Sequence, residues 1–71
     1  MEMEVDPMAL AVREAEEAIQ EVQEGAPVRE LTPQAAYVRR LQHQMAEKAQ
    51  LDSRSWGKEP FRKVKIFKGE G

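Results

Sequence analysis

The sequence predicts a two-layer α+β domain with the order helix, strand, helix, strand, strand (α-β-α-β-β). Residues 7–24 and 33–50 repeat apolar residues at the spacing of an amphipathic helix. Residues 51–67 instead alternate with a period of two on either side of a turn, which is typical of a hairpin. A chain of 71 residues makes one small domain with a thin core, so few layers can be built.

The first helix has a marked start and a marked end. Asp6 is expected to be the N-cap, and Pro7 suits the first helical position because its missing N–H costs nothing there. Gly25 follows the last periodic residue as a stop. The core stripe is predicted to be Met8, Ala11, Val12, Ala15, Ala18, Ile19 and Val22, and the solvated back to be Glu14, Glu16, Glu17, Glu21 and Glu24.

Residues 26–31, APVREL, are predicted to be a strand, because Pro27 disfavours helix for the residue before it and Val28 is β-branched. A second helix should then begin with Thr32 as N-cap and Pro33 at the first position. Its core stripe is expected to be Ala35, Val38, Leu41, Met45 and Ala49.

The segments LDSRSW (51–56) and FRKVKIF (61–67) are predicted to be two strands joined by the turn GKEP. A right-handed crossover through the second helix leaves the first two strands parallel, and the third fits between them, antiparallel to both. The sheet is therefore a three-stranded antiparallel sheet of order 2-3-1. Alternation places Leu51, Ser53, Ser55, Arg62, Val64 and Ile66 on the face covered by both helices, and Asp52, Arg54, Trp56, Lys63, Lys65 and Phe67 on the other.

These elements define a single domain over residues 7–68, with a flexible N-terminal segment at 1–6 and a flexible tail at 69–71. The chain has no cysteine, which excludes disulfides and thiolate metal sites. It has neither an apolar run of about 20 residues nor a signal-peptide pattern, so we expect a cytoplasmic protein.

The net charge of -2 conceals an uneven distribution. Residues 1–31 hold nine acidic residues against two arginines, whereas residues 32–71 hold nine basic residues against four acidic ones. A chain divided in this way can attract polyanions from one side. A merely solvated surface is the alternative.

Arg39 and His43, the only histidine, lie one helical turn apart on the flank of the second helix. We expect neither to point into the core. No serine or cysteine motif supports catalysis, and no second histidine supports a metal site, so neither enzymatic activity nor a cofactor is expected. A guanidinium and an imidazole together can donate hydrogen bonds to one phosphate. Arg62 is the best candidate to complete this site.

The segments RRLQH and LDSRSWGKEPFRKVKI resemble the R-3-H domain, named for an arginine and a histidine with three residues between them. The matching residues span about 31–67 and are Arg39, His43, Ser53, Ser55, Gly57, Glu59, Pro60, Arg62, Lys63, Val64 and Ile66. The resemblance implies a three-stranded sheet with two helices on one side, binding of single-stranded DNA or RNA, and phosphate contacts from Arg39 and His43. The chain departs from the usual pattern at Phe61, where the family often has a polar residue.

The sequence of residues 31–67 also looks like the R-3-H domain found at the carboxyl end of a bacterial and plastid group of AAA-type ATPases. This chain has no P-loop. The expected function is therefore binding of single-stranded nucleic acid, or of a nucleotide phosphate. Arg54 and Lys63 are further candidate contacts, Arg40 and Lys58 longer-range attractors, and Trp56 either a stacking residue or cover for the sheet. The alternative is a module that docks on a larger ATPase or self-associates.

Overall fold

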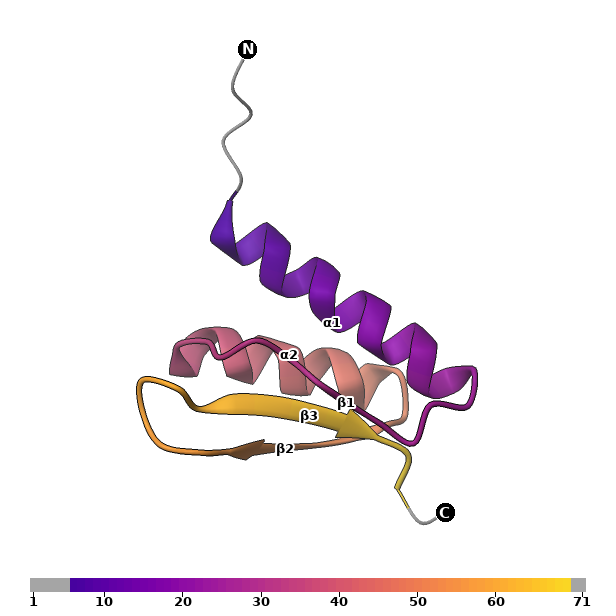
Figure 1. Cartoon of the computed structure of the whole chain (residues 1–71). Helices are drawn as coiled ribbons and strands as arrows, with labels where there is room; N and C mark the ends of the chain where they lie inside the picture. The colour runs from indigo at the N-terminus through magenta and orange to yellow at the C-terminus, as the bar shows by residue number, and fades with distance from the viewer. Residues whose placement is uncertain (1–5, 70–71) are drawn as a thin grey trace.

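The computed structural model describes residues 6–69, with the five elements in the predicted order (Figure 1). The predicted flexible segments 1–6 and 69–71 lie outside the described residues, apart from Asp6 and Gly69. The elements are α1 (Pro7–Gln23), β1 (Val28–Glu30), α2 (Ala36–Lys48), β2 (Asp52–Trp56) and β3 (Lys63–Phe67).

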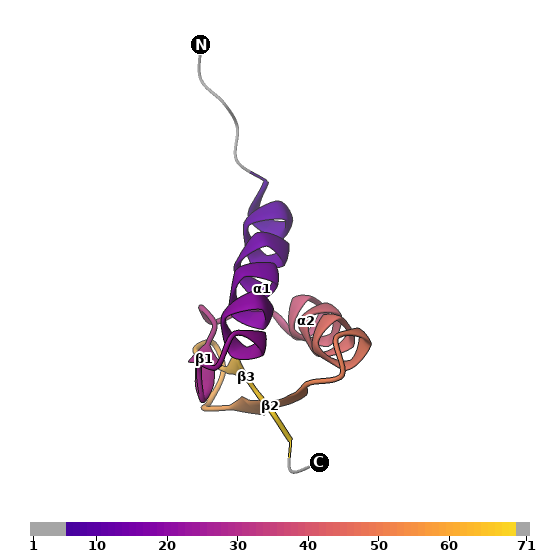
Figure 2. The same ribbon diagram turned by 90° about the vertical axis from the view of Figure 1, so that its right-hand side faces the viewer.

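The strands form one open antiparallel sheet of order β1-β3-β2, which confirms the predicted order. Ser53 lies opposite Ile66 and Ser55 opposite Val64, so these four side chains share a face. Both helices lie on one side of the sheet, α1 toward β1 and α2 toward β2, as two views at right angles show (Figures 1 and 2). No helix in residues 6–69 covers the other face, which we call the outer face.

Local signals define α1 as predicted. The Asp6 side chain accepts a hydrogen bond from the Met8 N–H at 3.0 Å, and Pro7 opens the helix. Beyond the C-cap, Gly25 adopts a φ of 120°, a left-handed conformation that suits glycine. The buried residues Ala11, Ala15, Ala18 and Val22 all belong to the predicted stripe.

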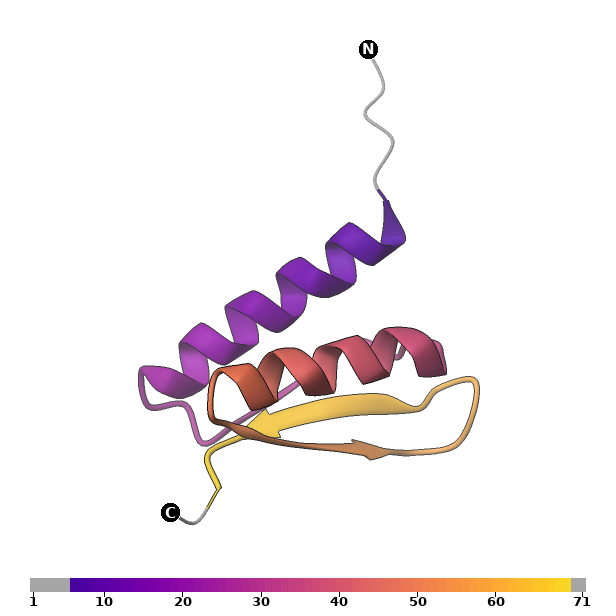
Figure 3. The ribbon, with the colours of Figure 1, turned by 180° about the vertical axis from the view of Figure 1, so that it is seen from behind.

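The core lies between the helices and the inner face of the sheet. Val64 and Ile66 of the central strand are completely buried. The buried alanines of α1 have small side chains, which leave room for α2 to pack closely. The view from behind shows the two helices on the same side of the sheet (Figure 3). The buried cluster consists of Ala15, Ala18, Val22, Leu31, Ala46, Leu51, Val64 and Ile66.

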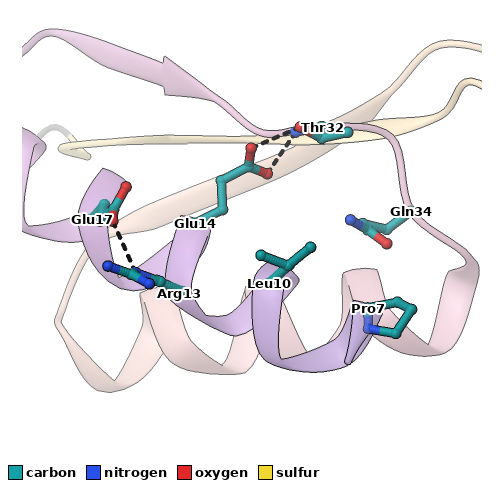
Figure 4. A pocket seen from close by; sticks show the side chains of 7 residues that line it. All are labelled: Pro7, Leu10, Arg13, Glu14, Glu17, Thr32 and Gln34. Carbon is teal, nitrogen blue, oxygen red and sulfur yellow. Dashed lines mark hydrogen bonds and ion pairs between the residues drawn. The ribbon is translucent and has the colours of Figure 1, made fainter. Parts of the chain in front are cut away.

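The prediction that α2 begins at Pro33 is wrong, because the helix starts at Ala36. Thr32 does not cap it. Instead, the Glu14 carboxylate accepts hydrogen bonds from both the Thr32 N–H and the Thr32 hydroxyl, each at 2.7 Å (Figure 4). Glu14 is consequently half-buried and not part of a solvated back. The chain before α2 stays extended beside β3, where the Leu31 N–H donates to the Val64 carbonyl at 2.8 Å.

The core stripe of α2 is also rotated from the prediction. Val38 is buried as expected, but Ala35 is exposed, and Leu41, Met45 and Ala49 are only half-buried. The rotation follows from the position of α2 between two neighbours, because it packs on α1 as well as on the sheet. The other buried residues of the helix are Arg39, Gln42 and Ala46.

Candidate nucleic-acid interface

His43 is held between two serines of the edge strand β2. Its Nδ1 lies 2.5 Å from the Ser53 hydroxyl, and its Nε2 lies 2.7 Å from the Ser55 hydroxyl. The Ser-x-Ser spacing makes this possible, because residues two apart in a strand project from the same face. Since both ring nitrogens are engaged, His43 ties the flank of α2 to β2.

The environment of His43 favours the neutral ring. Partial burial and, to a lesser extent, the positive charge of Arg39 lower the pKa of His43 from its usual 6.5. A neutral imidazole has one N–H donor and one acceptor nitrogen, so one serine hydroxyl accepts from the ring and the other donates to it. At pH 7 the ring therefore contributes hydrogen bonds and no full charge.

Arg39 is buried, with only 9% of its surface exposed, so the expectation that it avoids the interior is wrong. Its Nη1 donates to the Gln34 carbonyl at 2.7 Å, and its Nη2 lies 3.0 Å from the Glu59 carboxylate. These two partners offset part of the cost of burial, because each replaces a hydrogen bond that the guanidinium would otherwise make to water. Arg39 thus connects α2 to the chain before it and to the turn between β2 and β3.

That turn, residues 57–62, is closed by its own hydrogen bonds. The Phe61 N–H donates to the Lys58 carbonyl at 2.8 Å, and Arg62 Nη1 donates to the Gly57 carbonyl at 3.3 Å. Gly57 has a φ of 95°, and a Cβ there would approach the Phe61 carbonyl oxygen to 3.3 Å. The turn is therefore built around a glycine.

Arg62 lies at the same end of the domain as Arg39, but its side chain bonds to neither Arg39 nor the partners of Arg39. The Gln34 N–H donates to the Arg62 carbonyl at 3.3 Å, which places the two segments side by side. Because β3 begins at Lys63, the strand alternation used to orient Arg62 does not extend to it. Its side-chain hydrogen bond in the described structure goes to Gly57 and not to Arg39 or His43.

The outer face carries cations beside an aromatic ring. Lys63 Nζ lies 4.6 Å from the centre of the Trp56 ring and 3.5 Å from a Glu30 carboxylate oxygen. Trp56 is 44% exposed. The next cross-strand pair on this face joins the exposed Arg54 to Lys65, as the predicted alternation requires.

Two further predicted basic residues lie outside the sheet. Arg40 on α2 and Lys58 in the turn are both exposed.

Helix α1 carries acidic side chains, in contrast to the hairpin. A hollow between α1 and residues 32–34 is lined by seven side chains, of which two pairs interact directly (Figure 4). Arg13 Nε lies 3.4 Å from the Glu17 carboxylate, and Glu14 accepts from Thr32. Elsewhere on α1, Glu21 pairs with Arg29. The surface of α1 therefore offers little unpaired positive charge to an anion.

Sequence reasoning did not assign to Arg39 and His43 any of the four partners that the structure shows. Alternation places Ser53 and Ser55 on the face that the helices cover, and both match the family pattern, but nothing in the sequence assigned them to the His43 ring. Glu59 was noted as part of the turn, and nothing local indicated that its carboxylate would reach Arg39. The Gln34 carbonyl is available only because α2 starts late.

Neither helix in residues 6–69 is long and apolar enough to cross a membrane. Within the same residues, no three His, Cys, Asp or Glu side chains gather in a way that could hold a metal ion.

The fold and these contacts define a small α+β module in which an Arg-x-x-x-His helix is bonded to a Ser-x-Ser strand and to the turn after it. The family model of the R-3-H domain matches residues 11–68. The chain therefore belongs to the R-3-H domain family, which confirms the resemblance, and domains of this family are generally nucleic-acid-binding modules.

One curated relative extends the comparison. The chain is 47% identical over 38 residues to the uncharacterized protein ycf45 of Porphyra purpurea, a match that covers 54% of this chain and 7% of that protein. The chain thus corresponds to a small part of its relative. No solved structure matches the chain.

Proposed function

We propose that this chain binds single-stranded DNA or RNA through its β2–β3 hairpin. We call the basic residues Arg54, Lys58, Arg62, Lys63 and Lys65, together with Trp56, the hairpin surface. Residues 54–65 hold five basic residues and one acidic residue, Glu59, whose carboxylate is paired with Arg39. From β1, Glu30 also pairs with Lys63, which leaves the surface with an excess of positive charge. This surface therefore presents net positive charge to a polyanion.

The observation that carries the proposal is the pairing of Lys63 with the half-exposed Trp56 on an uncovered sheet face. Binders of single strands commonly stack bases on aromatic rings while cations beside the rings follow the phosphates. A nucleotide phosphate alone would use the same cations but would gain little from the ring. The arrangement favours a strand that carries bases.

In this proposal, Arg39 and His43 position the hairpin. His43 fixes β2 through the two serines, and Arg39 fixes the turn through Glu59. A second candidate role is the direct phosphate contact that the family resemblance implies. It is favoured by one observation: the Glu59 side chain is 61% exposed, so an incoming phosphate can replace its carboxylate at the Arg39 guanidinium.

The test is binding of labelled single-stranded DNA and RNA, measured by fluorescence anisotropy at low and at physiological salt. The double variant R54A/K58A should bind both strands more weakly than the wild type and lose less affinity as salt rises. The matched control is R13A/K48A, which removes two exposed cations away from the hairpin surface. The absence of wild-type binding at low salt would overturn the proposal, as would equal losses in the two double variants.

The alternative function is docking on a larger ATPase, or self-association, through the outer face. One observation favours it: Val28 is 43% exposed beside Phe67 in a shallow hollow that also includes Pro27. In that case the chain should sediment as an oligomer, or bind the rest of its parent protein, and Val28→Ser should abolish the association. Added salt should have little effect. Monomeric sedimentation at high concentration would exclude self-association.

A further inference from the structure

We infer that Phe61 is a base-stacking residue, displayed by the turn to a nucleobase of a bound single strand. This inference rests on the proposed function and adds a contact to it. At 72%, Phe61 has the largest exposed fraction among the large hydrophobic residues that the structure describes. It does not belong to the buried core cluster. Burial therefore gives no reason for an aromatic residue at this position.

The turn holds Phe61 in a defined place. Its own N–H is bonded to the Lys58 carbonyl, and the residue after it is bonded through both its side chain and its carbonyl. Glu59 anchors the turn to the buried Arg39. A ring carried by such a constrained turn loses less conformational entropy on binding than a ring in an unanchored loop.

The neighbours of Phe61 in the chain suit a nucleotide. Lys58 and Arg62 lie within three residues of it in the same turn, and Trp56 ends the strand that leads into the turn. A phenyl ring flanked in the chain by cations can stack on the face of a base while the cations contact the adjoining phosphates. Trp56 and Phe61 would then hold different bases of one strand.

The experiment compares two probes of equal length: labelled oligothymidylate, and a strand whose sugars carry no bases. Phe61→Ala should weaken binding of oligothymidylate about fivefold or more and leave binding of the abasic strand unchanged. Phe61→Leu keeps an apolar side chain without a ring, so it should lose nearly as much. Phe61→Trp should bind at least as tightly as the wild type. The salt dependence should be the same in all three variants, because no charge is removed.

Leu10→Ala is the control, because Leu10 is 53% exposed and lies on the acidic helix. Circular dichroism should show that every variant is folded. If the wild type binds oligothymidylate and Phe61→Ala or Phe61→Leu binds it equally well, stacking by Phe61 is wrong while the proposed function stands. Equal losses on both probes would likewise overturn stacking. If the wild type binds neither probe, the proposed function fails and this inference fails with it.

Discussion

Arg39 Nη2 lies 3.0 Å from Glu59 Oε1 and joins the middle of the chain to the turn that closes the hairpin. The arginine is buried, whereas the glutamate side chain is 61% exposed. Solvent therefore screens the ion pair, which contributes at most about 1 kcal/mol. The hydrogen bond from the same guanidinium to the Gln34 carbonyl is shielded on the arginine side and should contribute more.

We expect Arg39→Ala to lower the free energy of unfolding by about 2 to 3 kcal/mol, because both connections and the packing of the side-chain stem are lost. Arg40→Ala is the control on the same helix. Arg40 is exposed, so its removal should change stability by less than about 0.5 kcal/mol. Urea denaturation followed by circular dichroism measures both. Equal unfolding midpoints would contradict the anchoring role of Arg39.

Acid should weaken the domain through His43. The pKa of His43 is lowered in the folded state, so around and below pH 6.5 the unfolded chain binds the proton more readily than the folded chain. The stability from the neutral ring is therefore complete above pH 6.5 and is lost as pH falls through the lower folded pKa. His43→Gln should remove this part of the pH dependence.

Because His43 is the only histidine, the imidazole ring resonances in a proton NMR titration belong to it and report its pKa directly. A midpoint below 6.5 in the folded chain is the expected result. A midpoint above 6.5 would mean that the folded state favours the charged ring, and the predicted direction of the pH effect would be wrong.

The sequence was most informative where the determining contacts are local. The Asp6 cap, Pro7 and Gly25 act within one turn of α1, and all three were predicted. Strand alternation likewise placed Ser53 and Ser55 on the face that His43 contacts. The strand order followed from the handedness of the crossover. These features depend on neighbours in the chain or on general rules of chirality.

Contacts between distant residues caused the errors. Thr32 has the chemistry of an N-cap, but Glu14, which lies 18 residues earlier, takes both its N–H and its hydroxyl. A buried arginine is rare, so hydrophobic periodicity assigned Arg39 to the flank. Its burial depends on Glu59, a partner 20 positions away that no spacing rule indicates.

Gln42 should limit the stability of the domain. It is 1% exposed, and its Nε2 donates to the Ala11 carbonyl at a long 3.4 Å. Its Oε1 is buried and has no hydrogen-bond partner in the described structure. Such an acceptor costs about 1 to 3 kcal/mol, whereas a methionine of similar shape would leave no polar atom unpaired. We expect Gln42→Met to raise the free energy of unfolding by about 1 kcal/mol.

Gln44→Met makes the same chemical change at an exposed position of α2 and should leave stability nearly unchanged. Thermal and urea unfolding of the two variants provide the measurement. A Gln42→Met variant less stable than the wild type would show that the bond to Ala11 outweighs the unpaired oxygen.

The two roles considered for Arg39 predict different salt dependences of binding. If Arg39 only positions the turn, Arg39→Gln should reduce affinity while the slope of log K against log salt stays that of the wild type, since the same phosphates are neutralised. Lys58→Ala provides the reference, because losing one contact with a single strand should reduce the slope by about 0.7. We expect the first result for Arg39→Gln, measured at a temperature where the variant is folded. A slope reduced as much as in Lys58→Ala would instead show that a phosphate replaces Glu59 at the Arg39 guanidinium.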